Sequence, residues 1–201
     1  MSKSIEKKNL ILEKAKQVFM RNGFHNVTMK DIIEECQISR GGLYLYFSSV
    51  DEIFTEVIKT HNQNKLEQIR LSIKESSDFI GLIDLYLKAQ KERLLHMDNS
   101  LMLSQYEFFF AHRNEYDKDY FFSAFHNSKD IVCEILRFGV TKGQLDDEIV
   151  DMLSDNIMFV LEGLGTLAMS CGVSEELLDK QFAFIKKIVL TQCGGKDHEE
   201  K

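Results

Sequence analysis

The chain of 201 residues contains no proline and no tryptophan. A proline inside a helix costs about 3 kcal/mol, because it lacks an N–H group and its ring meets the preceding turn. The absence of proline therefore indicates a chain that is mostly helical. No run of about 18 apolar residues is present, which excludes an ordinary membrane-spanning helix. The N-terminal residues lack the apolar core of a signal peptide, so we expect a cytoplasmic protein.

Cysteine and histidine are few and scattered. The cysteines lie far apart and match no metal-site spacing, so we expect reduced thiols. Cys36 falls where a small buried residue is expected, which favours packing over redox sensing. The histidines form no pair at helical spacing next to a carboxylate, so neither a metal site nor a cofactor is expected. No phosphate-binding glycine loop or nucleophile motif supports an enzyme.

Charge is divided unevenly along the chain. The net charge is −7, yet residues 1–50 carry +3 and the remainder carries −10. This asymmetry fits an N-terminal part that faces DNA and an acidic body. Chance also produces a segment of +3, so the charge supports a DNA-binding function only together with a motif.

Residues 28–47 predict two short helices joined by a tight turn. Gly41 and Gly42 lie side by side in the second helix, where each glycine costs about 1 kcal/mol relative to alanine. Such a departure is typical of a functional surface, because glycine lets the backbone approach a partner closely. Leu43 and Phe47 are four residues apart and are predicted to anchor this helix to the core.

Capping patterns mark the starts of three consecutive helices here. Thr28 precedes Asp31 by three residues, and Ser49 precedes Glu52 by the same interval. Ser39 is the predicted N-cap of the helix between them. In each case a hydroxyl satisfies a free amide of the first turn.

Residues 10–54 resemble the DNA-binding domain of TetR-family transcriptional regulators. The order and spacing of the matching residues hold across this whole segment. They are Ile11-Leu12, Ala15, Phe19, Gly23-Phe24, Thr28 to Ile32, Ile38 to Tyr44, and Tyr46-Phe47. The resemblance implies an all-α protein in two parts. An N-terminal three-helix helix-turn-helix domain at 5–65 would join a C-terminal helical ligand-binding and dimerisation domain at 66–193, followed by a polar tail at 194–201.

The second helix of the motif is the predicted DNA-contacting element, because its residue types suit phosphate and base-edge contacts. The predicted DNA-binding residues are Thr28, Lys30, Ser39, Arg40, Gly41, Gly42, Tyr44 and Tyr46. Two positions depart from the family pattern. Gln37 replaces the usual turn glycine, and a positive φ there carries strain of about 1 kcal/mol. Val50 replaces a usual lysine and removes one expected phosphate contact.

From Ser49 onward the apolar periodicity predicts helices at 49–74, 79–97, 100–113, 115–142, 146–171 and 174–192. The last two are apolar on more than one face, whereas a surface helix needs only one apolar stripe. The second stripe indicates either deeper burial within one chain or contact with a second copy. The resemblance favours a homodimer. The predicted interface residues are Ile157, Leu161, Leu164, Phe182, Ile185 and Val189.

Aromatic residues are dense between 101 and 125, and Glu107 is the single acid of residues 101–112. Two interpretations stay open: an ordinary core, or a pocket for a hydrophobic cation. The residues of such a pocket would be Tyr106, Glu107, Phe109, Phe125 and Met158. Family members commonly bind a small inducer among the middle helices, so the resemblance implies a small, hydrophobic inducer.

The predicted function is a ligand-responsive transcriptional regulator that binds double-stranded operator DNA. The resemblance favours a repressor that its inducer releases from the operator. One alternative is a DNA-binding, chromosome-organising protein without a ligand, which a body without a cavity would favour. The other is a small helical enzyme, which convergent polar groups around a cavity would favour.

Overall fold

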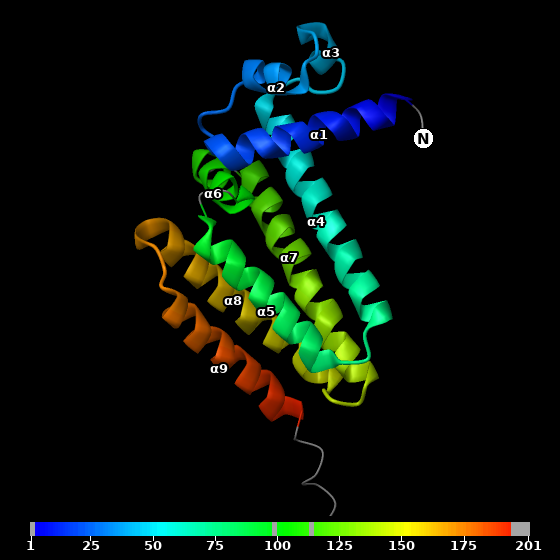
Figure 1. Ribbon diagram of the computed structural model, residues 1–201, viewed down its shortest axis with the longest axis vertical. Coiled ribbons are helices and arrows are strands. Elements are labelled where there is room, and N and C mark those ends of the chain that lie inside the picture. Colours follow the sequence, from blue (N-terminus) through cyan, green and yellow to red (C-terminus); the bar gives the residue numbers. More distant parts are fainter. Residues whose placement is uncertain (1–2, 98–99, 113–114, 194–201) are drawn as a thin grey trace, which may run out of the picture. The chain divides into compact units, whose positions relative to one another are not determined.

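The computed structural model describes residues 3–97, 100–112 and 115–193. Within these ranges the regular structure is helical, which confirms the predicted fold class (Figure 1). The predicted tail at 194–201 lies outside the described residues. The helices are α1 (Lys3–Asn22), α2 (Met29–Cys36), α3 (Arg40–Tyr44), α4 (Val50–Glu75), α5 (Phe79–Leu95), α6 (Leu101–Ala111), α7 (Glu115–Thr141), α8 (Asp147–Cys171) and α9 (Glu175–Cys193).

These helices form two compact units. The N-terminal unit comprises residues 1–63 together with 97–124, and the C-terminal unit comprises 64–96 together with 125–201. The long helices α4 and α7 each contribute residues to both units. Each unit is therefore built from two separate stretches of chain.

The sequence-based division assigned residues 97–124 to the C-terminal part, whereas the structure groups them with the N-terminal helices. The reason is long-range packing by α6. Leu101 and Phe108 are buried in the N-terminal core. The Ser104 hydroxyl, itself fully buried, donates a hydrogen bond of 2.9 Å to the backbone carbonyl of Phe19.

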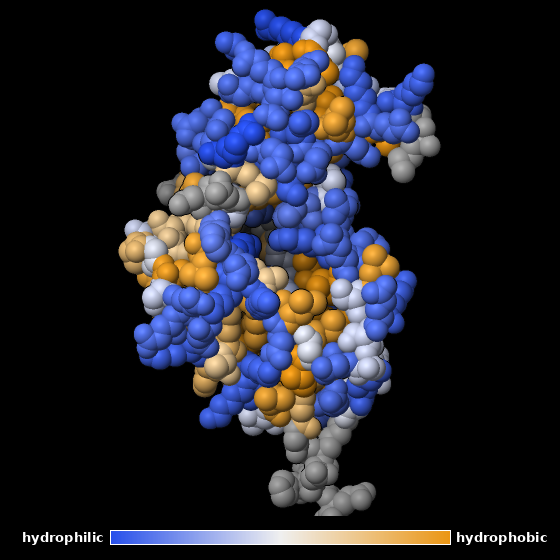
Figure 2. All heavy atoms as spheres, in the orientation of Figure 1, coloured by the Kyte–Doolittle hydropathy of each residue, from blue (hydrophilic) through white to orange (hydrophobic). Residues whose placement is uncertain are grey.

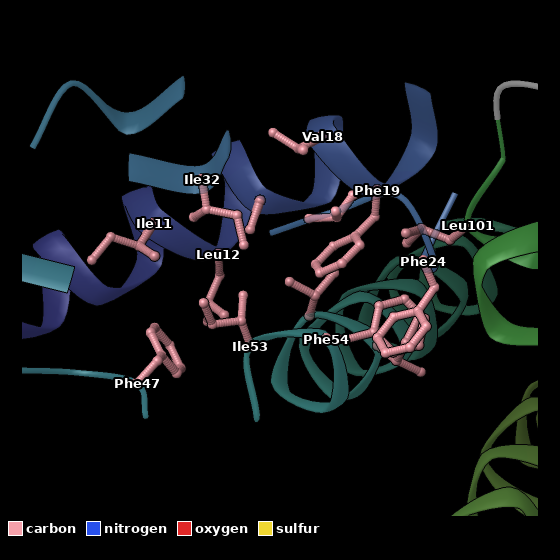
Figure 3. Close-up of a cluster of buried hydrophobic side chains, with 14 of the residues drawn as sticks. Ile11, Leu12, Val18, Phe19, Phe24, Ile32, Phe47, Ile53, Phe54 and Leu101 are labelled. Atoms are coloured by element: carbon pink, nitrogen blue, oxygen red, sulfur yellow. The ribbon is translucent and has the colours of Figure 1, made fainter. Parts of the chain in front are cut away.

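The core of the N-terminal unit is one apolar cluster, and Figure 3 shows side chains of α1 directed toward the start of α4. Aromatic rings fill its centre. Phe24 meets Phe108 edge-on at a centroid distance of 5.0 Å, and it lies 5.1 Å from Phe54. Such ring pairs stabilise a core by about 0.5–1.5 kcal/mol beyond their buried area. Helices α2 and α3 pack on this core through Ile32 and Leu43.

In the C-terminal unit, α5 packs against α8 and α9, and Figure 1 shows the three helices side by side. Ion pairs also join helices of this unit, α5 to α9 and α7 to α8. The Lys91 ammonium lies 2.8 Å from Glu175, and the Lys129 ammonium lies 2.7 Å from Asp155. On the face drawn in Figure 2, apolar side chains reach the surface of this unit among polar ones. No described helix is both long and apolar enough to cross a bilayer.

Candidate nucleic-acid interface

The first helix of the motif, α2, begins at a complete capping box. Asp31 N–H donates to the Thr28 hydroxyl at 3.4 Å, and Thr28 N–H donates to the Asp31 carboxylate at 2.8 Å. The hydrogen bonds from the Thr28 hydroxyl and amide hold the pKa of Asp31 below its usual value. The predicted capping pattern is confirmed, and it sets where α2 begins.

The turn between α2 and α3 is left-handed at Gln37, with φ 53° and ψ 44°. Ile38 N–H donates to the Ile33 carbonyl at 3.3 Å, which closes the end of α2. Gln37 is the non-glycine residue with a positive φ among the described residues, at the position where the family usually has glycine. A residue with a β-carbon costs about 1–2 kcal/mol in this conformation, so the turn is strained.

Helix α3 has one anchored face and one open face. Ser39 accepts a hydrogen bond of 3.1 Å from Gly42 N–H, which confirms it as the N-cap. Leu43 and Phe47 are buried in the N-terminal core, as predicted. On the open side the Arg40 guanidinium lies 5.4 Å from the centre of the Tyr44 ring. The cation and the aromatic ring are thus held together on the exposed surface.

The remaining predicted DNA-binding residues differ in their surroundings. Thr28 and Lys30 are exposed, and the Lys30 ammonium lies 3.6 Å from the Glu34 carboxylate. Tyr46 is partly buried and packs against the N-terminal core, which leaves only part of its side chain for a partner. Val50 packs against the same core at the start of α4.

Lys7 is a basic residue near α3 that the sequence did not single out. A β-carbon placed on Gly42 would lie 3.8 Å from the Lys7 ammonium, so this lysine of α1 reaches the second helix of the motif. Lys8 follows it but pairs with Glu56 at 3.0 Å. The signal in the sequence is the group of basic residues near the N-terminus, Lys3, Lys7 and Lys8.

Glu107 has a role that the pocket interpretation did not anticipate. Its carboxylate accepts hydrogen bonds from the backbone N–H groups of Phe24 and His25, the latter at 3.2 Å. These amides follow the end of α1, where Gly23 has φ 73°. A carboxylate there supplies the acceptor for two backbone amides beyond the end of the helix. Glu107 therefore tethers the loop that leads to α2.

The other predicted pocket residues do not belong to a single unit. Tyr106, Glu107 and Phe109 lie in the N-terminal unit, whereas Phe125 and Met158 lie in the C-terminal unit. Met158 is buried in the core of its unit.

The predicted interface residues need correction. Ile157, Leu161, Leu164, Phe182, Ile185 and Val189 are all buried within a single chain. They form the stripes of α8 and α9 that pack on their own unit, so they are not a surface for a second copy. The other stripe is open to solvent: Phe159 is 65% exposed and Phe184 is 58% exposed. Gly163 lies on the same exposed side of α8, with open space where a side chain would be.

The C-terminal unit also contains polar groups that the sequence did not single out. Burial raises the pKa of Tyr86 to about 12, with Arg93 lowering it and Glu162 raising it. The Nε atom of Arg93 is buried and has no hydrogen-bond partner among the described residues. Tyr86 and Arg93 lie two turns apart on α5, which places them on one face of that helix.

The cysteines are all unpaired by disulfides in the described part of the chain. Burial raises the pKa of the Cys36 thiol, with Glu35 adding to the effect, which opposes thiolate formation. Cys36 packs against the N-terminal core. Within the same residues no group of three or more metal-ligating side chains comes together.

The capped helices, the left-handed turn and the core that anchors α3 define an all-α protein with a helix-turn-helix unit near its N-terminus. Residues 11–57 match the model of bacterial regulatory proteins of the tetR family. Residues 11–57 therefore carry the N-terminal domain of this family.

Known relatives agree with that assignment. The chain is 36% identical over 135 residues to the uncharacterized HTH-type transcriptional regulator YfiR of Bacillus subtilis (strain 168). The match covers 67% of this chain and 65% of that relative, so the chain matches less than two thirds of its length.

Two solved structures share the fold at lower identity. The regulator FadR from Bacillus subtilis, in complex with stearoyl-CoA, is 17% identical with a TM-score of 0.67 and covers 92% of this chain and 98% of its own. A transcriptional regulator from Saccharomonospora viridis, in complex with choline, is 20% identical with a TM-score of 0.66 and covers 91% and 96%.

Proposed function

We propose that this protein is a transcriptional regulator that binds operator DNA as a homodimer and is released by a small hydrophobic ligand. The observation that carries the proposal is the open face of α3. It presents a cation over an aromatic ring beside Gly41, whose β-carbon position has no other described side chain within 4 Å. The family consists of regulatory proteins, which argues against an enzyme.

In this proposal α3 enters the major groove. Arg40 suits bidentate contact with guanine, and Tyr44 suits phosphate. Thr28, Lys30 and Lys7 surround the helix with further phosphate contacts. The glycine pair lets the backbone lie close to the base edges.

The DNA contacts can be tested on sequences selected from a random duplex pool by the unmodified protein. Arg40→Ala should weaken binding of the selected sequence by about 1–3 kcal/mol, measured by fluorescence anisotropy at fixed salt. Lys88→Ala is the matched control, because it removes one exposed positive charge from α5 in the other unit. Equal affinities of all three proteins would refute the assignment of α3 as the contacting helix.

The proposed dimer uses the exposed stripe of α8 and α9. Exposed aromatic rings on two adjacent helices are costly in water and suit an isologous contact around a two-fold axis. A dimer would place two α3 helices on half-sites one helical turn apart, about 34–36 Å. Phe184→Glu should then give folded monomers in sedimentation. Phe182→Glu, whose parent side chain is buried two residues earlier, should instead unfold the chain.

The ligand is proposed to act through the helical body by changing the separation of the two α3 helices. It must bind one arrangement better than the other, because equal affinity shifts nothing. The structural neighbours that hold stearoyl-CoA and choline support a ligand of this general kind. Phe125 and Met158 are proposed apolar contacts, and Tyr86 and Arg93 suit the polar end of a ligand.

The ligand proposal is tested with stearoyl-CoA and choline as probes. A probe that binds the folded state raises the thermal midpoint by mass action. The same probe should release the selected DNA at matching concentration. DNA binding that responds to no hydrophobic probe in a broad panel would favour the alternative, a chromosome-organising protein without a ligand.

A further inference from the structure

Leu45 is the most exposed of the large apolar side chains in the described residues, at 81%. It is the C-cap of α3 and keeps helical geometry, with φ −68° and ψ −22°. Its N–H donates to the Gly41 carbonyl at 3.2 Å. The backbone of residues 41–45 is therefore one regular helical turn.

That regularity fixes the direction of the Leu45 side chain relative to the core. Leu43 is fully buried and marks the inner face of α3. At about 100° per residue, Gly41 and Leu45 both fall on the face opposite Leu43. Side chains of helices lean toward the preceding turn, so Leu45 lies over the surface that Gly41 leaves open.

We propose that Leu45 contacts the 5-methyl group of thymine in the major groove and makes the protein select thymine at that position. The inference rests on the proposed function, in which α3 is the helix in the groove. Leucine has neither donor nor acceptor, so it cannot read the polar edges of guanine, adenine or cytosine. The thymine methyl is the one apolar group that base pairs present there.

The surroundings of Leu45 favour this role over a packing role. Its near neighbour Leu43 already fills the core position, and Phe47 fills the next. The open space at Gly41 gives a base room to approach the leucine. Arg40 on the adjacent side of the helix supplies the polar contact that a leucine lacks.

The test replaces each thymine of the selected duplex with deoxyuridine, one position at a time. This change removes the methyl group and keeps every hydrogen-bonding group. At one thymine in each half-site, the unmodified protein should lose about fourfold in affinity, the value of one buried methyl group. Leu45→Ala should bind the thymine duplex more weakly and should bind the thymine and deoxyuridine duplexes equally.

Leu71→Ala is the matched control, because it removes the same atoms from another exposed leucine, at 53% exposure, on the part of α4 in the C-terminal unit. It should keep the fourfold difference. A Leu45→Ala protein that still prefers thymine would overturn the proposal, since the effect would then come from the DNA itself or another residue. No deoxyuridine effect at any position would also overturn it.

These outcomes are separable from failure of the proposed function. If Arg40→Ala weakens binding but deoxyuridine has no effect, α3 is in the groove and only the role of Leu45 is wrong. If the unmodified protein selects no sequence from the pool, both proposals fail together. Circular dichroism of Leu45→Ala should match the unmodified protein, because the side chain contributes little to the core.

Discussion

Replacing Glu107 with alanine should destabilise the N-terminal unit in the absence of any ligand or DNA. The carboxylate accepts two backbone N–H groups, from Phe24 and His25, and the first of these is partly buried. Hydrogen bonds to a charged group contribute about 1.5–3 kcal/mol each, with exposed ones at the lower end or below. We therefore expect a loss of about 2–3 kcal/mol. For a chain of this size that lowers the thermal midpoint by roughly 4–12 °C.

Glu107→Gln serves as the graded variant. Its amide oxygen still accepts the hydrogen bond from Phe24, so only the charge-assisted part is lost. We expect about half the effect of the alanine change.

Gly23 provides the stricter test, because its geometry and that of Glu107 are coupled. A β-carbon on Gly23 would lie 2.6 Å from one oxygen of Glu107 and 2.9 Å from the other. Gly23→Ala must displace the carboxylate and also holds a positive φ of 73° with a β-carbon, which costs about 1–2 kcal/mol. In the double variant the carboxylate is already gone and only the backbone cost remains.

The double variant should therefore lose about 1–2 kcal/mol less unfolding free energy than the sum of the losses in the two single variants. Urea unfolding of the four proteins, followed by circular dichroism, measures this coupling. Additive effects, or a midpoint for Glu107→Ala within about 1 °C of the unmodified protein, would refute the tether.

Three further predictions concern the strained turn, the capping box and a crowded helix contact. In scanning calorimetry the thermal midpoint of Gln37→Val should lie below that of the unmodified protein and below that of Gln37→Gly, because a β-branched residue fits the left-handed region worst and glycine fits it best. The lowered pKa of Asp31 stabilises the fold above about pH 4, and this contribution is lost as the pH falls through the folded pKa. Carbon-detected NMR titration should therefore show Asp31 below its usual pKa, and Thr28→Val should raise it. Gly139→Ala should destabilise by about 1–3 kcal/mol in urea unfolding, since the new β-carbon would lie 2.8 Å from the Phe79 ring, and Phe79→Leu should reduce that cost.

The sequence predicted those features that depend on residues close together in the chain. The start of α2 follows from Thr28 and Asp31, and the start of α3 follows from Ser39. These are interactions over three or four residues, where capping and turn chemistry apply directly.

The features that were missed depend on long-range contacts. The hydrogen bond from the Ser104 hydroxyl to the Phe19 carbonyl spans 85 residues, and the one from Phe24 N–H to the Glu107 carboxylate spans 83. Apolar periodicity showed that α6 would be buried but not against which helices. The same limit produced the error at α8 and α9, where each helix has two apolar stripes. Which stripe faces inward is decided by α5, and no local pattern of residues 147–193 records that choice.

The division of the N-terminal unit into two stretches of chain has a consequence during synthesis on the ribosome. Helices α1 to α3 leave the ribosome well before Leu101, Ser104 and Phe108, which complete their core. A nascent chain that ends near residue 65 therefore exposes the surface around Phe24 and Phe54 until α6 arrives. Closing such a long loop is slow compared with forming local helices. The helix-turn-helix unit, although first in the sequence, should acquire its full stability only after α6 has emerged.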